Sequence, residues 1–392
     1  MLRHMFYSRL FAGISVFGFA LALGATLRLA VAECAWRWGS GPGAGWTLTL
    51  GNARHFEDLA ERQPVSAGSW LRVAVRLNPH DSIAWMALGL AAERDGDMEK
   101  AAAYLLEAEK VDRQYLPAWT SANFFFRRVN HLQFWRAASR AAAISYDDMA
   151  ALIDLADHRE PNAIAALERL GESARLERGY LHFLIGRSRW REAAAVAARL
   201  CLRGDPGDRE LLLNFTDRLI EANEGEAALA AWNGLHPLPG PDRASHGMLV
   251  NENFKRQPSG HGFDWRVTVP PPGSVHWEPS KLKLSLADST PDAFTLLEQR
   301  VVLEPGRYRL RFEYRTEGLA EQTGLRWTLL QGGRVEASSP AWAQASKATV
   351  AEWYFPVAKA GLYALTWIYS RVPGTTRPEG RAQLSLAGLE MR

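Results

Sequence analysis

Two tryptophans set the period of the first half of the chain. Trp85 and Trp119 lie 34 residues apart. Small and apolar residues follow the first tryptophan at helical offsets, namely Leu88, Gly89, Ala92, Ala101, Leu105 and Ala108. A period of this length is typical of two-helix units that stack on their neighbours, because one unit cannot bury its apolar face alone. The spacing therefore predicts a series of helical hairpins, which favours binding over catalysis.

The same spacing resembles the tetratricopeptide repeat. Pro79 closes the unit before Trp85, whereas Asn123 and Trp135 make the unit after Trp119 degenerate. The residues predicted to pack the repeats are Trp85, Leu88, Gly89, Ala92, Ala101, Ala108 and Trp119. The period slips between residues 145 and 175, where a shortened or irregular helical pair is expected. The resemblance implies an all-α array over residues 48–241 that binds a protein partner in its groove.

The N-terminal segment has the pattern of a membrane anchor. No charge interrupts the stretch from Leu10 to Leu27, which is long enough to cross a bilayer, and Arg3 and Arg9 precede it. We expect a cytoplasmic stub and a transmembrane helix within residues 1–33, and a flexible linker over 34–47. This makes the protein a single-pass inner-membrane protein with its bulk in the periplasm. The alternative is a signal peptide cleaved after Ala32, since small residues end it.

The hydrophobic period changes after a proline cluster that ends the helical pattern at residues 237–241. From Arg307 to Arg315, apolar residues alternate with charged ones, as a half-buried strand requires. Similar segments follow to the end of the chain, with turns between them. Residues 247–392 are therefore predicted to form an all-β sandwich of about eight strands. The predicted fold class is multidomain: a transmembrane helix, an all-α repeat array and a C-terminal all-β jelly-roll sandwich.

Two stretches of this half resemble the jelly-roll carbohydrate-binding modules. They are Leu249 to Phe254 and Leu297 to Tyr314, the second with its Gln299 and Tyr308. The resemblance implies that the sandwich binds glycan. No cofactor is expected, although a structural calcium ion in the sandwich is left open.

Two sets of residues are candidates for glycan binding. Trp265, Trp277 and Trp342 lie in segments rich in Gly, Pro and Ser, where a flat indole could serve as an apolar platform for a sugar. The alternative for each tryptophan is core packing. Guanidinium groups on the outward face of the 307–315 strand could bind carboxylates in bidentate fashion. They belong to Arg307, Arg309, Arg311 and Arg315. The alternative is a solvated strand face with acidic partners on the neighbouring strands.

A third likeness covers the whole arrangement. It is carried by Asp112-Arg113-Gln114, Ala122 to Arg128, Phe134-Trp135 and Gly262 to Arg266. These stretches resemble a group of exported repeat proteins found in acidobacteria. That resemblance implies an association with the assembly or export of surface polysaccharide.

Composition and motifs narrow the function classes. The net charge of +3 is too small for a chain of 392 residues to indicate nucleic-acid binding. The sequence has no nucleophile elbow, zinc-protease helix or phosphate-binding loop. His261 and Asp264, with Glu252 nearby, suggest a catalytic pair, but a glycine-rich turn explains them better. The predicted function is a non-enzymatic scaffold that binds protein through its repeats and glycan through its sandwich. The alternatives are a structural protein with a protein-docking sandwich and, third, a glycan hydrolase.

Overall fold

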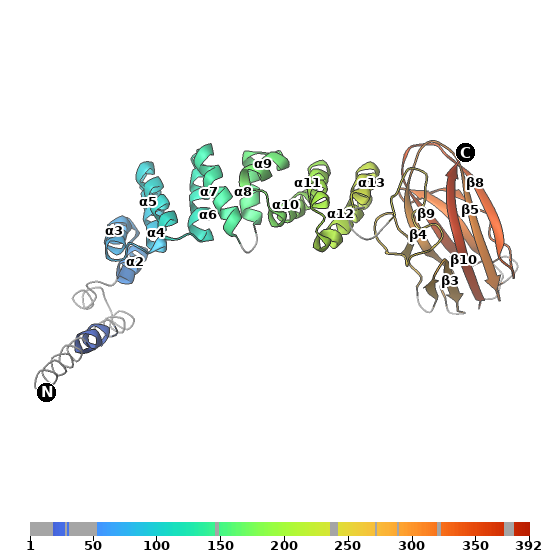
Figure 1. Ribbon diagram of the computed structural model, residues 1–392, viewed down its shortest axis with the longest axis horizontal. Coiled ribbons are helices and arrows are strands. Elements are labelled where there is room, and N and C mark those ends of the chain that lie inside the picture. Colours follow the sequence, from blue (N-terminus) through green and yellow to red (C-terminus); the bar gives the residue numbers. More distant parts are fainter. Residues whose placement is uncertain are drawn as a thin grey trace, which may run out of the picture. The chain divides into compact units, whose positions relative to one another are not determined.

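Figure 1 shows a computed structural model of the protein as a ribbon. The chain divides into two compact units. The first comprises Met1–Ala156 and Arg169–Gly171, and the second comprises Asp157–Glu168 and Glu172–Arg392. The structure describes residues 19–27, 30, 53–145, 149–235, 242–270, 273–287, 290–319, 323–371 and 380–392.

Helical hairpins build the first unit. Its helices are α2 (Ala53–Arg62), α3 (Ala67–Leu77), α4 (Ser82–Arg94), α5 (Met98–Val111), α6 (Tyr115–Arg127) and α7 (His131–Ile144). Within it, α2 packs on α3, α4 on α5 and α6 on α7. Polar caps define the starts: the side chains of Asp81, Asp97 and Asn130 accept backbone N–H bonds from the first turns of α4, α5 and α7. The predicted hairpins are thus present.

Gly89 shows why the contact between paired helices requires small residues. A Cβ atom at Gly89 would lie 2.8 Å from Cγ of Leu105, so α4 and α5 approach more closely than a side chain allows. Ala101 and Ala108 of α5 are fully buried. Leu88 is also buried, and Ala92 is half-buried. The spacing read from the sequence therefore reflects the contact between paired helices.

The two tryptophans are partly exposed. The Trp85 indole donates a hydrogen bond to the carbonyl of Pro79 at 2.9 Å and lies 5.9 Å from the ring of Tyr104. Trp119 stacks on Tyr115, with 7° between the ring planes. Both therefore pack against neighbouring side chains, and neither is at the centre of the core.

Ion pairs also connect the hairpins. Glu93 at the end of α4 accepts hydrogen bonds from Arg127 and Arg128 at the end of α6, at 2.7 and 2.8 Å. Its pKa is lowered, because the bonds from the two arginines outweigh the effect of burial, which raises it. Buried Glu109 of α5 pairs with Arg140 of α7 at 3.2 Å. Charged side chains thus link successive hairpins.

The second unit continues the helical pattern. Across the unit boundary lies α8 (Ala150–Arg159), followed by α9 (Ala163–Leu170), α10 (Ala174–Gly186), α11 (Trp190–Arg203), α12 (Arg209–Glu221) and α13 (Gly225–Gly234). Helices α8 and α9 have only 10 and 8 residues, which agrees with the shortened pair expected between residues 145 and 175. Helix α10 packs on α11, and α12 on α13.

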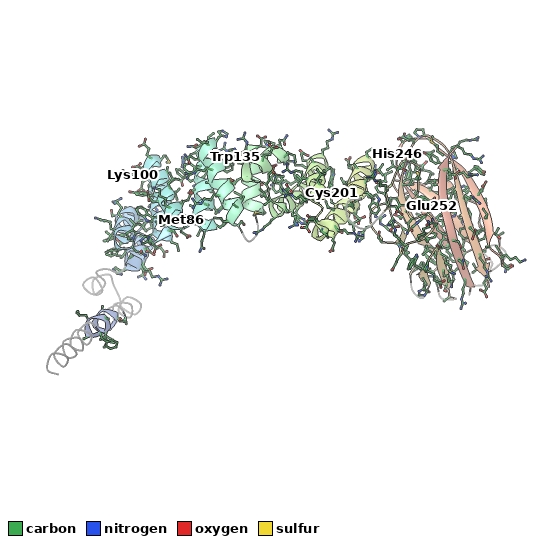
Figure 2. The ribbon with its side chains drawn as sticks, in the orientation of Figure 1. Met86, Lys100, Trp135, Cys201, His246 and Glu252 are labelled. Atoms are coloured by element: carbon green, nitrogen blue, oxygen red, sulfur yellow. The ribbon has the colours of Figure 1, made fainter. Side chains whose placement is uncertain are left out.

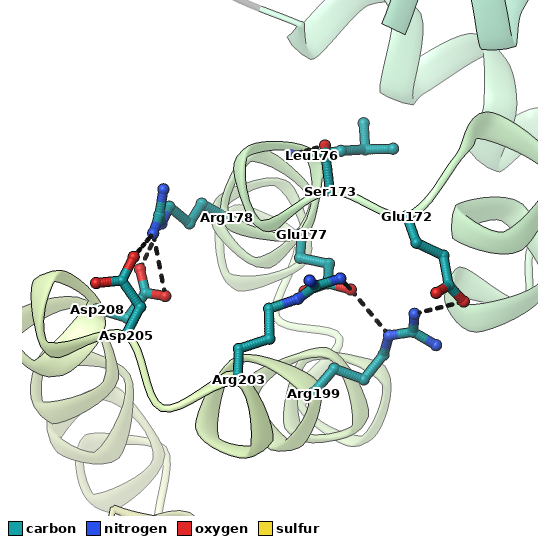
Figure 3. A network of polar contacts seen from close by, with 9 residues as sticks. All are labelled: Glu172, Ser173, Leu176, Glu177, Arg178, Arg199, Arg203, Asp205 and Asp208. Carbon is teal, nitrogen blue, oxygen red and sulfur yellow. Dashed lines mark hydrogen bonds and ion pairs between the residues drawn. The ribbon is translucent and has the colours of Figure 1, made fainter. Parts of the chain in front are cut away.

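A buried carboxylate lies between α10 and α11. Glu177 has no exposed side-chain surface and accepts hydrogen bonds from Arg199 and Arg203, the closest at 2.6 Å (Figure 3). Burial raises the pKa of Glu177, but the hydrogen bonds and charges of the arginines outweigh it, so the pKa is lowered. Arg178 on the same helix pairs with Asp205 and Asp208 before α12. The two buried carboxylates, Glu177 and Asp208, are thus each paired with arginine, and these ion pairs join the helices.

Two antiparallel sheets form the C-terminal sandwich. One has the strand order β1-β4-β9-β6-β7 and the other β2-β3-β10-β5-β8. The strands are β1 (Arg266–Val267), β2 (Ser274–Glu278), β3 (Lys281–Leu286), β4 (Ala293–Leu303), β5 (Gly306–Glu317), β6 (Leu325–Gln331), β7 (Arg334–Ser338), β8 (Thr349–Val357), β9 (Gly361–Ser370) and β10 (Gly380–Met391). Strands β3 to β6 alternate between the sheets, and so do β8 to β10, as in a jelly roll.

Alternation places the core as predicted. Tyr308, Leu310, Phe312 and Tyr314 of β5 point inward and are at most 5% exposed. Among the described residues, five buried tryptophans join them in this core, namely Trp265, Trp327, Trp342, Trp353 and Trp367. Aromatic rings therefore share the sandwich core with leucine and valine side chains.

The last hairpin is fastened to the start of the sandwich. Asp217 of α12 accepts hydrogen bonds from the backbone N–H of Gly262 and from Arg266, and it pairs with His261, each at 2.7 Å. Gly262 has a φ of 55° and lies so close to Trp232 of α13 that a Cβ atom would be 2.1 Å from the ring. The domain boundary expected at residues 237–241 lies outside the described residues, but the helices and strands on either side of it belong to one unit.

The predicted membrane anchor is not supported. Within the parts of the chain that the structure describes, no helix has both the length and the apolar character needed to span a bilayer. This finding conflicts with the prediction of a single-pass inner-membrane protein, which is therefore corrected. Residues 1–18 and the linker over residues 34–47 lie outside the described residues.

Candidate functional site

A polar groove crosses the outward face of the sheet that contains β5. It has a volume of about 520 Å³ and is lined by residues of β2, β3, β10 and β5. Strand register aligns four side chains across it: His276 faces Lys283, Lys283 faces Gln383, and Gln383 faces Arg315. Adjacent strands lie about 4.8 Å apart, so this row is about 14 Å long. Hydrogen-bonding groups are thus presented at the spacing of the strands.

Positive charge predominates in the groove. Lys281, Lys283, Arg315 and Arg381 line it, against the carboxylates of Glu278 and Glu317. Glu278 pairs with Lys283 at 2.6 Å and with Lys281 at 3.1 Å, and these bonds lower its pKa. Within the described parts of the chain, no carboxylate forms an ion pair with Arg315 or Arg381. Two guanidinium groups are therefore available for an anionic ligand.

The arginine ridge predicted on β5 is present but is not uniform. Arg307, Arg311 and Arg315 are exposed, and Arg309 is half-buried. Arg309 lies between Glu352 of β8 and Glu390 of β10 and pairs with both. Arg309 thus has acidic partners on the neighbouring strands, as the alternative interpretation expected, whereas Arg315 lines the groove.

The tryptophans predicted as sugar platforms are placed elsewhere. Trp265 is completely buried, and Trp342 is 3% exposed and stacks on Trp367 with ring centroids 5.0 Å apart. Trp277 is partly buried against the core and donates a hydrogen bond to the carbonyl of Phe254. The role of Trp265 and Trp342 is therefore corrected: loop indoles fill the space between the sheets, where no sugar can stack on them.

An exposed aromatic ring occurs instead on β8. Tyr354 is 53% exposed, and the guanidinium of Arg392 lies 5.3 Å from the centre of its ring. Together with Arg307 it borders a second hollow of about 380 Å³ on the same sheet. Tyr354 could not be singled out in advance, because the alternating pattern of β8 marks it only as an outward residue.

Asp264, which was considered as a catalytic carboxylate, has a structural role. Its carboxylate accepts backbone N–H bonds from Ser259 at 3.0 Å and Trp265 at 2.8 Å, as the glycine-rich turn predicted. His261 is paired with Asp217 of α12 and not with Asp264. Glu252 is exposed (labelled in Figure 2). That the protein is not an enzyme stays a prediction.

The first unit has a hollow of another character. It has a volume of about 300 Å³ and lies among α2, α3 and α4, with mostly alanine and leucine in its walls. Two apolar side chains beside it are solvent-exposed: Ile83 is 64% exposed and Leu90 is 46% exposed. Glu57, Glu61 and Arg94 form its polar rim. An apolar side chain of another molecule would fit such a surface.

Sequence reasoning missed most of the groove. His276, Lys283, Arg381 and Gln383 come from strands at opposite ends of the domain's sequence, and only Arg315 was singled out in advance. The alternation of polar and apolar residues from Lys281 to Leu286 is typical of a half-buried strand, and it marks Lys283 as an outward residue. The pairing of β3 with β10 had no such signal.

No protein-family profile and no curated protein sequence matches the chain, so the resemblances to tetratricopeptide repeats and to exported acidobacterial proteins stay predictions.

Solved structures similar to part of the chain include carbohydrate-binding modules. A family 4 module has 7% identity and a TM-score of 0.29, over 36% of this chain and 98% of that one. A family 61 module in complex with β-1,4-galactotriose has 19% identity and a TM-score of 0.27, over 38% of this chain and 100% of that one. A cyclase from Fischerella has 15% identity and a TM-score of 0.23, over 37% and 96%. With TM-scores of 0.29 and below, these likenesses carry no argument about binding.

Proposed function

We propose that the protein is a non-enzymatic scaffold whose sandwich binds an acidic glycan in the groove of β2, β3, β10 and β5. The observation that carries this proposal is the pair of guanidinium groups, Arg315 and Arg381, beside a row of polar side chains in register. A guanidinium binds a carboxylate through two parallel hydrogen bonds, which fixes both position and orientation.

The remaining groups of the groove suit a sugar. Gln383 and His276 offer donors and acceptors for hydroxyl groups, and Ser285 adds a hydroxyl of its own. Tyr354 and Arg307 extend the same sheet face with an exposed ring and a cation. Glycan binding therefore rests on the groove itself and not on the weak likeness to solved modules.

Isothermal titration calorimetry of the full chain tests the proposal. We expect polygalacturonate to bind and dextran, which is neutral, to bind far more weakly. Replacing Arg315 and Arg381 by Ser should lower the affinity by about 10- to 100-fold, because a hydrogen bond to a charged group contributes roughly 1.5–3 kcal/mol. Arg334→Ser, on exposed strand β7 of the other sheet, is the matched control and should leave the affinity unchanged.

Two outcomes would refute acidic-glycan binding. One is equal affinity for the charged and the neutral polysaccharide, and the other is wild-type affinity in the Arg315→Ser, Arg381→Ser variant. Added salt gives a further check, because the ion pairs of an exposed groove weaken as ionic strength rises.

The helical unit is proposed to bind a protein partner. The support is the apolar hollow of α2, α3 and α4 with exposed Ile83 and Leu90 beside it. An apolar anchor residue of a partner would be buried there, as at the centre of many interfaces. Association of the partner with polysaccharide assembly, which the acidobacterial resemblance implies, belongs to this proposal and not to the observations.

A further inference from the structure

Three side chains with metal-binding atoms converge beside the last helix of the second unit. Glu226 lies in the first turn of α13, His246 in the segment that follows α13, and Glu304 between β4 and β5. One ligand atom from each lies within 4.8 Å of the other two. His246 Nε2 is 2.9 Å from a Glu226 oxygen and 3.9 Å from a Glu304 oxygen (His246 is labelled in Figure 2).

Hydrogen bonds and close packing hold the three backbones in place. The N–H of Gly247, next to His246, donates to the carbonyl of Val302 at 2.9 Å. The hydroxyl of Tyr308 accepts from the N–H of Glu304 and donates to its carbonyl. On α13, a Cβ atom at Gly225 would lie 3.2 Å from Leu362 of β9, so the first turn sits against the sandwich. Little ordering of the backbone would therefore accompany binding of an ion.

The charges in the cluster are not balanced. Two carboxylates face one imidazole, and in the parts of the chain that the structure describes neither Glu226 nor Glu304 pairs with a lysine or arginine. Their side chains are 71% and 51% exposed, and that of His246 is 41% exposed, so an ion can reach all three. Like charges this close repel one another, and a cation between them removes that repulsion.

We propose that Glu226, His246 and Glu304 bind a divalent transition-metal ion of the zinc class. An imidazole nitrogen with two carboxylate oxygens is a donor set that zinc accepts, whereas calcium and magnesium take oxygen ligands. Water completes the coordination, because the site is open. This site lies apart from the glycan groove and does not depend on the proposed function. It is also distinct from the structural calcium ion that the sequence left open for the sandwich.

The ion would connect parts of the unit that are distant in sequence. Its ligands come from a helix, a connecting segment and a strand turn, so metal binding favours the state in which α13 contacts the sandwich. A ligand that binds only the folded state raises its stability in proportion to the logarithm of its concentration. The affinity must fall in acid, because the imidazole has to be neutral to bind the metal.

Calorimetric titration of the full chain, without an affinity tag and stripped of metal with a chelator, tests this site. We expect one Zn²⁺ to bind per chain, with Mg²⁺ and Ca²⁺ at least about tenfold weaker. His246→Ala should weaken Zn²⁺ binding by at least about tenfold, and Glu304→Gln should weaken it too. His276→Ala, an exposed histidine of β2, is the matched control and should bind Zn²⁺ like the wild type.

The melting temperature gives an independent readout. Zn²⁺ should raise that of the wild type and of His276→Ala but not that of His246→Ala, and circular dichroism without metal should show that all three are folded. Wild-type Zn²⁺ affinity in His246→Ala would overturn the proposal, as would the lack of a saturable site in the wild type. In either case the cluster is only a polar contact of His246 with Glu226 and Glu304.

Discussion

The helical hairpins and the sandwich are packed by side chains of opposite size. Between α4 and α5 the contact is made by Gly89 and fully buried alanines, so the two backbones come close together. Between the sheets, large rings such as Trp327 and Trp367 fill a gap about 10 Å thick. The hairpins are therefore sensitive to added volume, and the sandwich is sensitive to lost volume.

The largest effect should come from removing a ring between the sheets. Trp367→Ala is expected to destabilise the second unit by about 3–5 kcal/mol, because a fully buried tryptophan leaves a cavity that its neighbours cannot fill. The free energy of unfolding in urea measures this. Trp85→Ala, which removes a partly exposed tryptophan of α4, is the control and should cost clearly less. Equal losses would contradict the contrast between the two cores.

Added volume in a hairpin should come next. Gly89→Leu is expected to cost about 1–3 kcal/mol, because the new side chain must push α4 away from Leu105. Thermal unfolding measures the change. In Gly186→Leu, at the end of α10, no atom apart from its chain neighbours and the backbone of its own helix lies within 4 Å of the added Cβ, so this variant should keep the wild-type melting temperature. A wild-type melting temperature for Gly89→Leu would show that the two helices are not in close contact.

The smallest expected effect concerns the buried charge between α10 and α11. The folded pKa of Glu177 lies below its ordinary value of 4.5, so its stabilisation is complete above that pH and is lost as the pH falls through the folded pKa. Glu177→Gln should cost about 1 kcal/mol at neutral pH, because a charge-assisted hydrogen bond is roughly twice as strong as a neutral one.

Urea unfolding at neutral pH and at about pH 3 separates this contribution, since acid protonates the carboxylate. The difference between wild type and Glu177→Gln should shrink in acid. Glu221→Gln, which alters an exposed pair with Arg218 at the end of α12, is the control and should change little at either pH. A difference that persists in acid would mean that the charge of Glu177 is unimportant.

Local structure could be predicted from the sequence where the hydrophobic pattern has a regular period. The spacing around Gly89 indicated the hairpins, and the alternation from Arg307 to Arg315 indicated β5 with the correct inward face. What it could not indicate were pairings between distant strands. His276 and Gln383 are more than a hundred residues apart, so the groove exists only through the register of β2, β3 and β10.

The tryptophans illustrate the other limit. Trp265 and Trp342 lie in segments whose composition is typical of exposed loops, yet both are buried. Local composition reports on the backbone of a loop, whereas burial depends on the empty volume that the rest of the fold leaves. The ion pair of Glu93 with Arg127 lies between these cases, since its 34-residue separation matches the period but required the hairpins to be known.

The contact of Gly262 with Trp232 has a consequence for how the chain is completed during synthesis. The helices α12 and α13 emerge from the ribosome before the residues that satisfy Asp217 and cover the indole of Trp232. Until then, the last hairpin exposes the apolar ring of Trp232, and Asp217 lacks its protein partners. In a chain that stopped before residue 242, this surface would stay exposed, and we expect such a chain to self-associate. The sandwich thus covers the end of the last hairpin of the second unit, as a terminal capping unit does in a repeat array.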